Sequence, residues 1–102
     1  MTLKCIAVDD EPLALKLVEK FIEQTPFLEL IHSCDNAIEA MTFIREKQPD
    51  LVFLDIEMPN LNGFQLLEAL RPYSFQVVFV TAYNQYAIKA LRMSAFDYLL
   101  KP

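Results

Sequence analysis

The stretch Leu51-Val52-Phe53-Leu54-Asp55 decides how this chain folds, because four consecutive apolar residues end at an acid. A short run that is apolar at every position is typical of a strand buried on both faces. A second run of this kind, Val77-Val78-Phe79-Val80, ends at Thr81. Such strands occur in parallel sheets that carry helices on both faces, so the two runs predict an α/β fold.

The segments around these runs alternate between strand and helix patterns. Further strands are predicted over 3–8, 28–33 and 96–100. Helices are predicted over 12–24, from a cap at Asp35 or Asn36 to about 48, over 64–70 and around 87–91. Parallel strands need crossover connections, which are right-handed almost without exception. The chain reaches Lys101-Pro102 where a fifth helix is expected to begin. We therefore expect the last strand to expose an apolar patch.

Composition excludes several classes of protein. The 102 residues include 9 Lys+Arg and 14 Asp+Glu, a net charge of −5 that gives no basic surface for nucleic acid. No apolar run approaches the ~18 residues of a membrane span, and acids after position 8 interrupt a signal peptide. The single glycine, Gly63, excludes a glycine-rich phosphate loop. The single histidine, His32, argues against a histidine metal site and a catalytic triad. The two cysteines, Cys5 and Cys34, are too few for a zinc cluster or a disulfide scaffold. We expect a cytoplasmic protein with reduced thiols.

Polar residues follow the predicted strands. In an open α/β sheet, ligands bind outside the carboxyl ends of the strands, and these ends carry Asp9-Asp10, Asp55, Thr81 and Lys101. Three carboxylates in one small cleft repel each other, and Mg²⁺, which prefers carboxylate, water and phosphate oxygens, relieves that repulsion. A lysine and a hydroxyl suit phosphoryl oxygens, and a carboxylate on a rigid strand can attack phosphorus. The pattern indicates phosphoryl transfer.

Four blocks of sequence resemble the response-regulator receiver domain in order, spacing and place at the strand ends. They are Val8-Asp9-Asp10-Glu11-Pro12, Leu54-Asp55-Ile56-Glu57-Met58-Pro59 with Gly63, Val80-Thr81-Ala82-Tyr83, and Phe96-Asp97-Tyr98-Leu99-Leu100-Lys101-Pro102. The last two blocks look like those of receivers attached to LytTR-type DNA-binding domains. The resemblance implies one receiver domain over 1–102, truncated before its last helix, with the flavodoxin-like (CheY-like) sheet order 2-1-3-4-5.

The resemblance also implies the chemistry at the acids. Asp55 would be the phosphoacceptor, and a sensor histidine kinase would supply the phosphoryl group. Asp10 and Asp55 would bind Mg²⁺ through their carboxylates, Asp9 would assist through water, and Glu57 would contribute its backbone carbonyl. The domain would then be a switch that phosphorylates and dephosphorylates itself, and not a conventional enzyme.

The remaining matched residues would transmit the signal. Lys101 would contact the phosphoryl group, Thr81 would move to hydrogen-bond it, and Tyr98 would turn inward. The bond between Lys101 and Pro102 would be cis. The face of the fourth helix and fifth strand would form a homodimer. DNA would be bound only through an output domain outside this chain, and no membrane contact is expected.

Two other classes remain open. The segment Asp55-Ile56-Glu57 could imitate the Asp-x-Asp pair of a phosphatase or phosphotransferase, although no second acid is clearly supplied for the leaving group. Turnover of a generic phosphomonoester would favour that class. The chain could also be a receiver-shaped interaction module that is never phosphorylated, which failure to react with acetyl phosphate would support.

Overall fold

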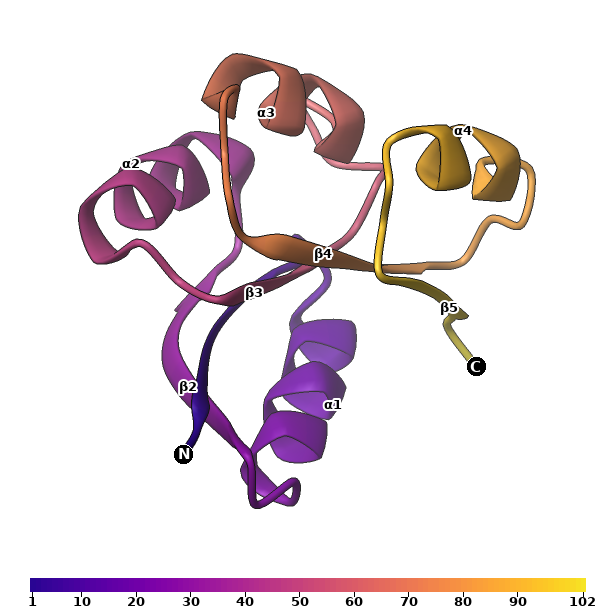
Figure 1. Ribbon diagram of the computed structural model, residues 1–102. Coiled ribbons are helices and arrows are strands. Elements are labelled where there is room, and N and C mark those ends of the chain that lie inside the picture. Colours follow the sequence, from indigo (N-terminus) through magenta and orange to yellow (C-terminus); the bar gives the residue numbers. More distant parts are fainter.

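The computed structural model describes residues 1–102 and contains one five-stranded parallel sheet with four helices (Figure 1). The strand order is β2-β1-β3-β4-β5. The elements in chain order are β1 (Leu3–Val8), α1 (Pro12–Glu23), β2 (Leu28–Cys34), α2 (Ala37–Lys47), β3 (Leu51–Leu54), α3 (Gly63–Leu70), β4 (Gln76–Thr81), α4 (Ala87–Arg92) and β5 (Asp97–Leu100). The expected fold class, alternation and strand order are confirmed.

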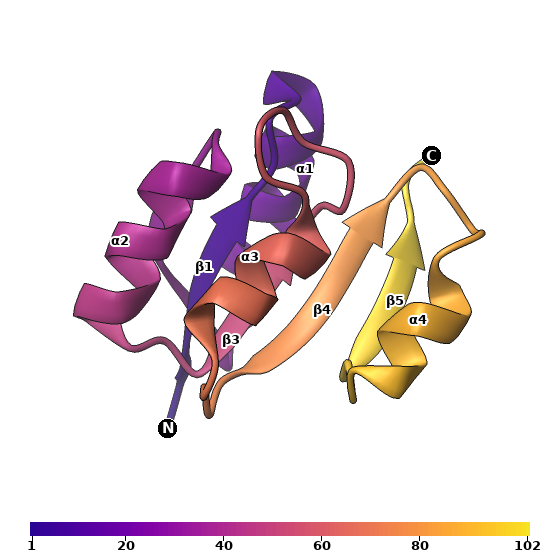
Figure 2. The same cartoon turned by 90° about the horizontal axis from the view of Figure 1, so that it is seen from above.

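The helices lie on both sides of the sheet. Helices α2, α3 and α4 lie on one side and α1 on the other (Figures 1 and 2). All four residues of β3 are buried, because alternate residues enter two separate cores. Val52 belongs to a cluster of 17 buried residues under α2, α3 and α4. Phe53 belongs to a cluster of seven buried residues that includes α1.

Side chains at the helix ends explain where two helices begin. Of the two residues considered as a cap for α2, Asn36 is the one that acts, since its side chain accepts a hydrogen bond from the Glu39 N–H at 2.8 Å. Helix α3 begins with a reciprocal pair, in which Asn62 and Gln65 each bond the other's backbone N–H through a side chain. Backbone geometry corrects one expectation. The cis peptide bond is Arg71–Pro72, whereas Lys101–Pro102 takes the trans form that X–Pro bonds ordinarily prefer.

The α1 side of the sheet leaves apolar surface exposed, as expected. A groove of about 380 Å³ runs between α1 and the ends of β4 and β5. Leu17 on α1 is 56% exposed, and Leu99 and Leu100 on β5 are 39% and 56% exposed. None of the helices has the length and apolar character needed to cross a membrane.

Candidate functional site

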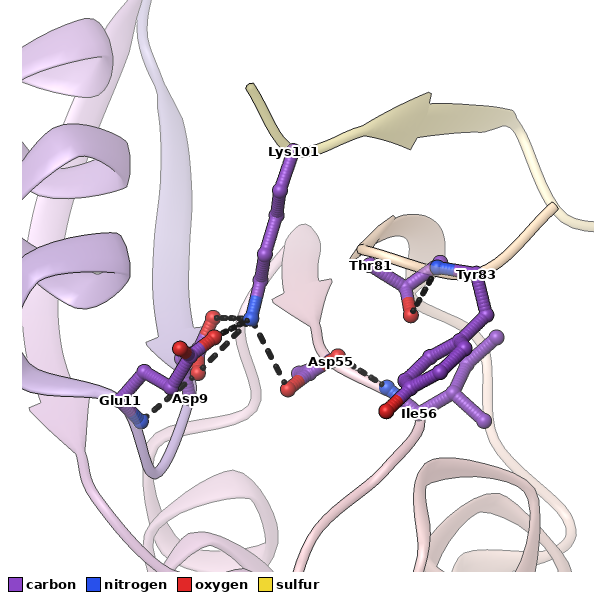
Figure 3. Close-up of polar contacts among 7 residues, drawn as sticks. All are labelled: Asp9, Glu11, Asp55, Ile56, Thr81, Tyr83 and Lys101. Atoms are coloured by element: carbon purple, nitrogen blue, oxygen red, sulfur yellow. Dashed lines mark hydrogen bonds and ion pairs between the residues drawn. The ribbon is translucent and has the colours of Figure 1, made fainter.

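Four strand ends meet at one edge of the sheet and bring their polar residues together (Figure 3). Asp9 follows β1, Asp55 follows β3, Thr81 ends β4, and Lys101 follows β5. The backbone ladder continues through these positions. The Asp55 N–H donates to the Val8 carbonyl at 3.0 Å, and the Lys101 N–H donates to the Thr81 carbonyl at 2.8 Å. The same hydrogen bonds that form the sheet therefore position the site.

Lys101 reaches across this edge to three carboxylates. Its Nζ lies 3.1 Å from Asp9 Oδ2, 3.2 Å from Asp55 Oδ2 and 2.5 Å from Glu11 Oε1 (Figure 3). Burial alone would lower the pKa of Lys101, but hydrogen bonds to Glu11 and Asp9 and the charge of Asp55 outweigh burial and raise that pKa above its ordinary value. Lys101 is therefore a permanent cation of the site.

Asp55 is a buried carboxylate between a cation and another acid. Only 4% of the residue is exposed, and its Oδ1 accepts a hydrogen bond from the Ile56 N–H at 2.8 Å. Burial, and then the charge of Asp9, raise the pKa of Asp55, while Lys101 lowers it, and the balance stands at about 6. The carboxylate is ionised near neutral pH, which a nucleophile requires.

The acidic residues fit a divalent cation. Carboxylate oxygens of Asp9, Glu11 and Asp55 all lie within 4.8 Å of one another. Three negative charges face the one charge of Lys101, and the buried Asp9 Oδ2 accepts no hydrogen bond, although Lys101 lies nearby. Excess negative charge on hard oxygen ligands matches the preference of Mg²⁺. Asp9, Asp55 and Glu11 are the residues placed to hold it.

One carboxylate that the sequence predicted as a metal ligand, that of the half-buried Asp10, is not part of this cluster. The predicted contribution of Glu57 is its backbone carbonyl, which the cluster of side-chain oxygens does not test. Glu11 takes a place in the cluster that the sequence analysis did not assign to it. The signal for Glu11 was its position beside Asp9-Asp10 at the cap of α1.

Thr81 and Tyr98 both hold the same residue of the loop after β4. Thr81 is fully buried, and its Oγ1 accepts a hydrogen bond from the Tyr83 N–H at 3.4 Å. The Tyr98 hydroxyl donates to the Tyr83 carbonyl. The Tyr98 ring is half-buried and packs against Phe79, with 6.3 Å between the ring centroids. The two expected switch residues are thus connected through Tyr83.

Gly63, the first residue of α3, lies close to the backbone of Asp55 and Ile56. Its N–H donates to the Ile56 carbonyl at 2.8 Å. A Cβ at this position would lie 2.5 Å from the Asp55 carbonyl oxygen, a distance that real Cβ atoms essentially never show. Only glycine lets the start of α3 approach the segment that carries Asp55 so closely.

Comparison with known proteins agrees with this architecture. A family model, the response regulator receiver domain, matches residues 5–102. An uncharacterized response regulatory protein of Yersinia pestis is 48% identical over 101 residues, which are 98% of this chain and 42% of that protein. The transcriptional regulatory protein BtsR of Escherichia coli is 42% identical over 104 residues, with the same coverage.

Solved structures show the same fold. The response regulator domain of Thermotoga maritima CheB aligns with a TM-score of 0.89 at 28% identity, covering 100% of this chain and 80% of that one. The response regulatory domain of mrkE from Klebsiella pneumoniae aligns with a TM-score of 0.89 at 33% identity, covering 98% and 84%. This chain belongs to the response regulator receiver domain family of two-component systems. It spans 42% of the length of the two curated relatives.

Proposed function

We propose that this receiver domain takes a phosphoryl group onto Asp55 from a sensor histidine kinase in a Mg²⁺-dependent reaction. The observation that carries the proposal is the position of Asp55. Its buried carboxylate ends the central strand β3 and faces Lys101 Nζ at 3.2 Å, and the acids beside it suit Mg²⁺. Asp9 also follows a strand, contacts Lys101 and belongs to the acidic cluster, but of the clustered acids only Asp55 follows the central strand β3.

The arrangement supports an in-line transfer. Oδ1 of Asp55 is occupied by the Ile56 N–H, which leaves Oδ2 to form the new bond to phosphorus as the bond from phosphorus to the donor breaks. The Lys101 ammonium, now beside Oδ2, would then pair with an oxygen of the transferred group. Mg²⁺ supplies charge neutralisation when it is bound. Asp9 and Glu11 keep a negative environment that holds it.

Phosphorylation would reach the surface through Thr81. If the Thr81 side chain moves so that its hydroxyl donates a hydrogen bond to a phosphoryl oxygen, the same movement disturbs the 3.4 Å hydrogen bond that Thr81 accepts from the Tyr83 N–H. Tyr98 is tied to the same residue, so a shift of Tyr83 frees the Tyr98 hydroxyl to turn inward. Two existing conformations need only a few kcal/mol of bias for such a switch.

The output would lie beyond this domain. Ile88 and Leu91 of α4 are 65% and 76% exposed, and with β5 they offer an apolar face for a homodimer. BtsR is named a transcriptional regulatory protein, and this chain matches 42% of its length. We infer a DNA-binding output domain of the LytTR type outside these residues, since a net charge of −5 does not suit contact with DNA here.

Acetyl phosphate provides a direct test of the phosphoacceptor. With Mg²⁺, the intact mass of the wild type should rise by one phosphoryl group, and D55N should show no gain. D35N is the matched control, because Asp35 is exposed and outside the acidic cluster, and it should react like the wild type.

Three results would count against the proposal. Equal labelling of D55N would place the acceptor elsewhere. A wild type that never reacts would indicate a pure interaction module. Sustained turnover of a generic phosphomonoester, lost in D55N, would indicate a phosphatase.

A further inference from the structure

A second group of metal-ligand side chains lies between β2 and α2, outside the phosphoryl site. His32 and Cys34 come from β2, and Glu39 comes from the first turn of α2. One ligand atom of each residue lies within 4.8 Å of those of the other two. Imidazole nitrogen, thiol sulfur and carboxylate oxygen are the three kinds of protein ligand that zinc takes.

An irregularity in β2 brings these groups to the same side. Along β1, Cys5 pairs with Leu30, but the next residue, Ile6, pairs with His32, so Ile31 is an extra residue in β2. Bulges of this kind re-aim the side chains that follow them. Because side chains alternate along a strand, the extra residue moves His32, and the cysteine two positions later, to the face that α2 covers.

Contacts from α2 orient the histidine and the glutamate. The His32 ring stacks on Phe43, with 3.6 Å between ring centroids. His32 Nε2 lies 3.5 Å from Glu39 Oε1, and Glu39 Oε2 is 3.4 Å from the side-chain nitrogen of Asn36. The side chains of His32 and Glu39 are 28% and 45% exposed, so an ion can reach them from solvent.

The Cys34 thiol is the least satisfied member of the group. The residue is 1% exposed, and its sulfur makes no hydrogen bond, whereas the Cys5 thiol donates to the Leu3 carbonyl at 3.5 Å. The Cys34 sulfur therefore has no protein partner of its own, while an imidazole nitrogen and a carboxylate oxygen lie within 4.8 Å of it.

We propose that His32, Cys34 and Glu39 form a binding site for Zn²⁺ or a similar borderline transition-metal ion, with water as the fourth ligand. Tetrahedral zinc holds its protein ligands about 3.5 Å apart. The 3.5 Å between His32 Nε2 and Glu39 Oε1 already meets this spacing, and small rotations of these half-exposed side chains would close on the sulfur. On binding, the thiol loses its proton to solvent and the sulfur bonds to the metal as thiolate.

This site differs from the acidic cluster in the ions it favours. Mg²⁺ prefers oxygen ligands and binds sulfur poorly. Asp9, Glu11 and Asp55 offer only carboxylate oxygens, which match this preference. Saturating Mg²⁺ should therefore occupy the acidic cluster and leave the sulfur-containing site free. The proposal does not depend on phosphorylation of Asp55.

Titration with Co²⁺ in excess Mg²⁺ tests the site through its absorption spectrum. The wild type should bind one equivalent with a thiolate-to-cobalt charge-transfer band in the near ultraviolet, and Zn²⁺ should displace it. C34S should lose the band, and C5S, the matched control, should keep it. H32Q and E39Q should each raise the apparent Kd for Co²⁺ at least roughly tenfold.

The proposal is overturned if the wild type gives no charge-transfer band, if C34S keeps it, or if H32Q and E39Q both bind Co²⁺ like the wild type. Circular dichroism establishes that each variant is folded. If C34S fails to fold, the two half-exposed positions decide the matter, because their side chains can be exchanged without opening the core.

Discussion

Asp55 carries a charge that the folded chain holds at a cost. Burial and the charge of Asp9 raise its pKa from 3.8 to about 6. Between these values the folded state binds more protons than the unfolded state, so the carboxylate destabilises the fold above pH 6. The penalty disappears as the pH falls below 3.8. The proposed role of Asp55 as an ionised nucleophile would thus oppose stability at this residue.

Replacement of the acid should therefore stabilise the protein. Without Mg²⁺ at pH 7.5, D55N should raise the free energy of unfolding by on the order of 1–3 kcal/mol, because the amide removes a buried charge and Lys101 keeps Asp9 and Glu11 as partners. Urea unfolding at pH 7.5 and pH 3.5 measures this, and the gain should vanish at the lower pH. A loss of stability, or an equal gain at both values, would contradict the assigned pKa.

At the scale of elements, the start of α3 fixes where β3 presents its acid. G63A should lower the free energy of unfolding by about 1–3 kcal/mol, because the added methyl group meets the Asp55 carbonyl oxygen and backbone must move. Phosphoryl uptake from acetyl phosphate should slow as Asp55 is displaced. Chemical denaturation and intact mass report the two effects.

A substitution on the same helix separates packing from helix propensity. Ala69 is exposed on α3, so A69G should cost about 1 kcal/mol through propensity alone and leave phosphoryl uptake unchanged. If G63A matched the wild type in both measurements, close approach of the two backbones would not be what the site requires.

The elements also show what sequence alone could predict. The sequence predicts β3 and β4 because a strand buried on both faces is apolar at consecutive positions instead of alternating with polar residues. The ends of these two runs then indicate where Asp55 and Thr81 lie. The sequence did not indicate that His32, Cys34 and Glu39 lie close together, because the bulge in β2 that sets their common face leaves no mark in the sequence. Contacts between side chains, such as Glu11 with Lys101, depend on tertiary geometry that periodicity does not contain.

At the scale of the whole molecule, the two faces of the sheet are closed to different degrees. The side under α2, α3 and α4 buries a cluster of 17 residues, whereas the α1 side buries seven and leaves the groove beside β4 and β5. The acidic cluster lies at the edge where both layers meet, and its residues come from separate strands and the cap of α1. Repulsion among the three carboxylates therefore acts between separate elements of the sheet and lowers the stability of the whole fold.

Mg²⁺ should therefore stabilise the whole fold, and only where the acids are ionised. At pH 7.5, an ion concentration 100 times its Kd should add about 2.7 kcal/mol to the free energy of unfolding, because the ion binds the folded state and not the unfolded chain. At pH 3.5, below the pKa of about 6 for Asp55, protons compete for the same oxygens and the gain should disappear. Thermal unfolding with and without Mg²⁺ at each pH measures this. D35N should respond like the wild type and D55N much less, so an equal response of D55N would place the ion away from the acidic cluster.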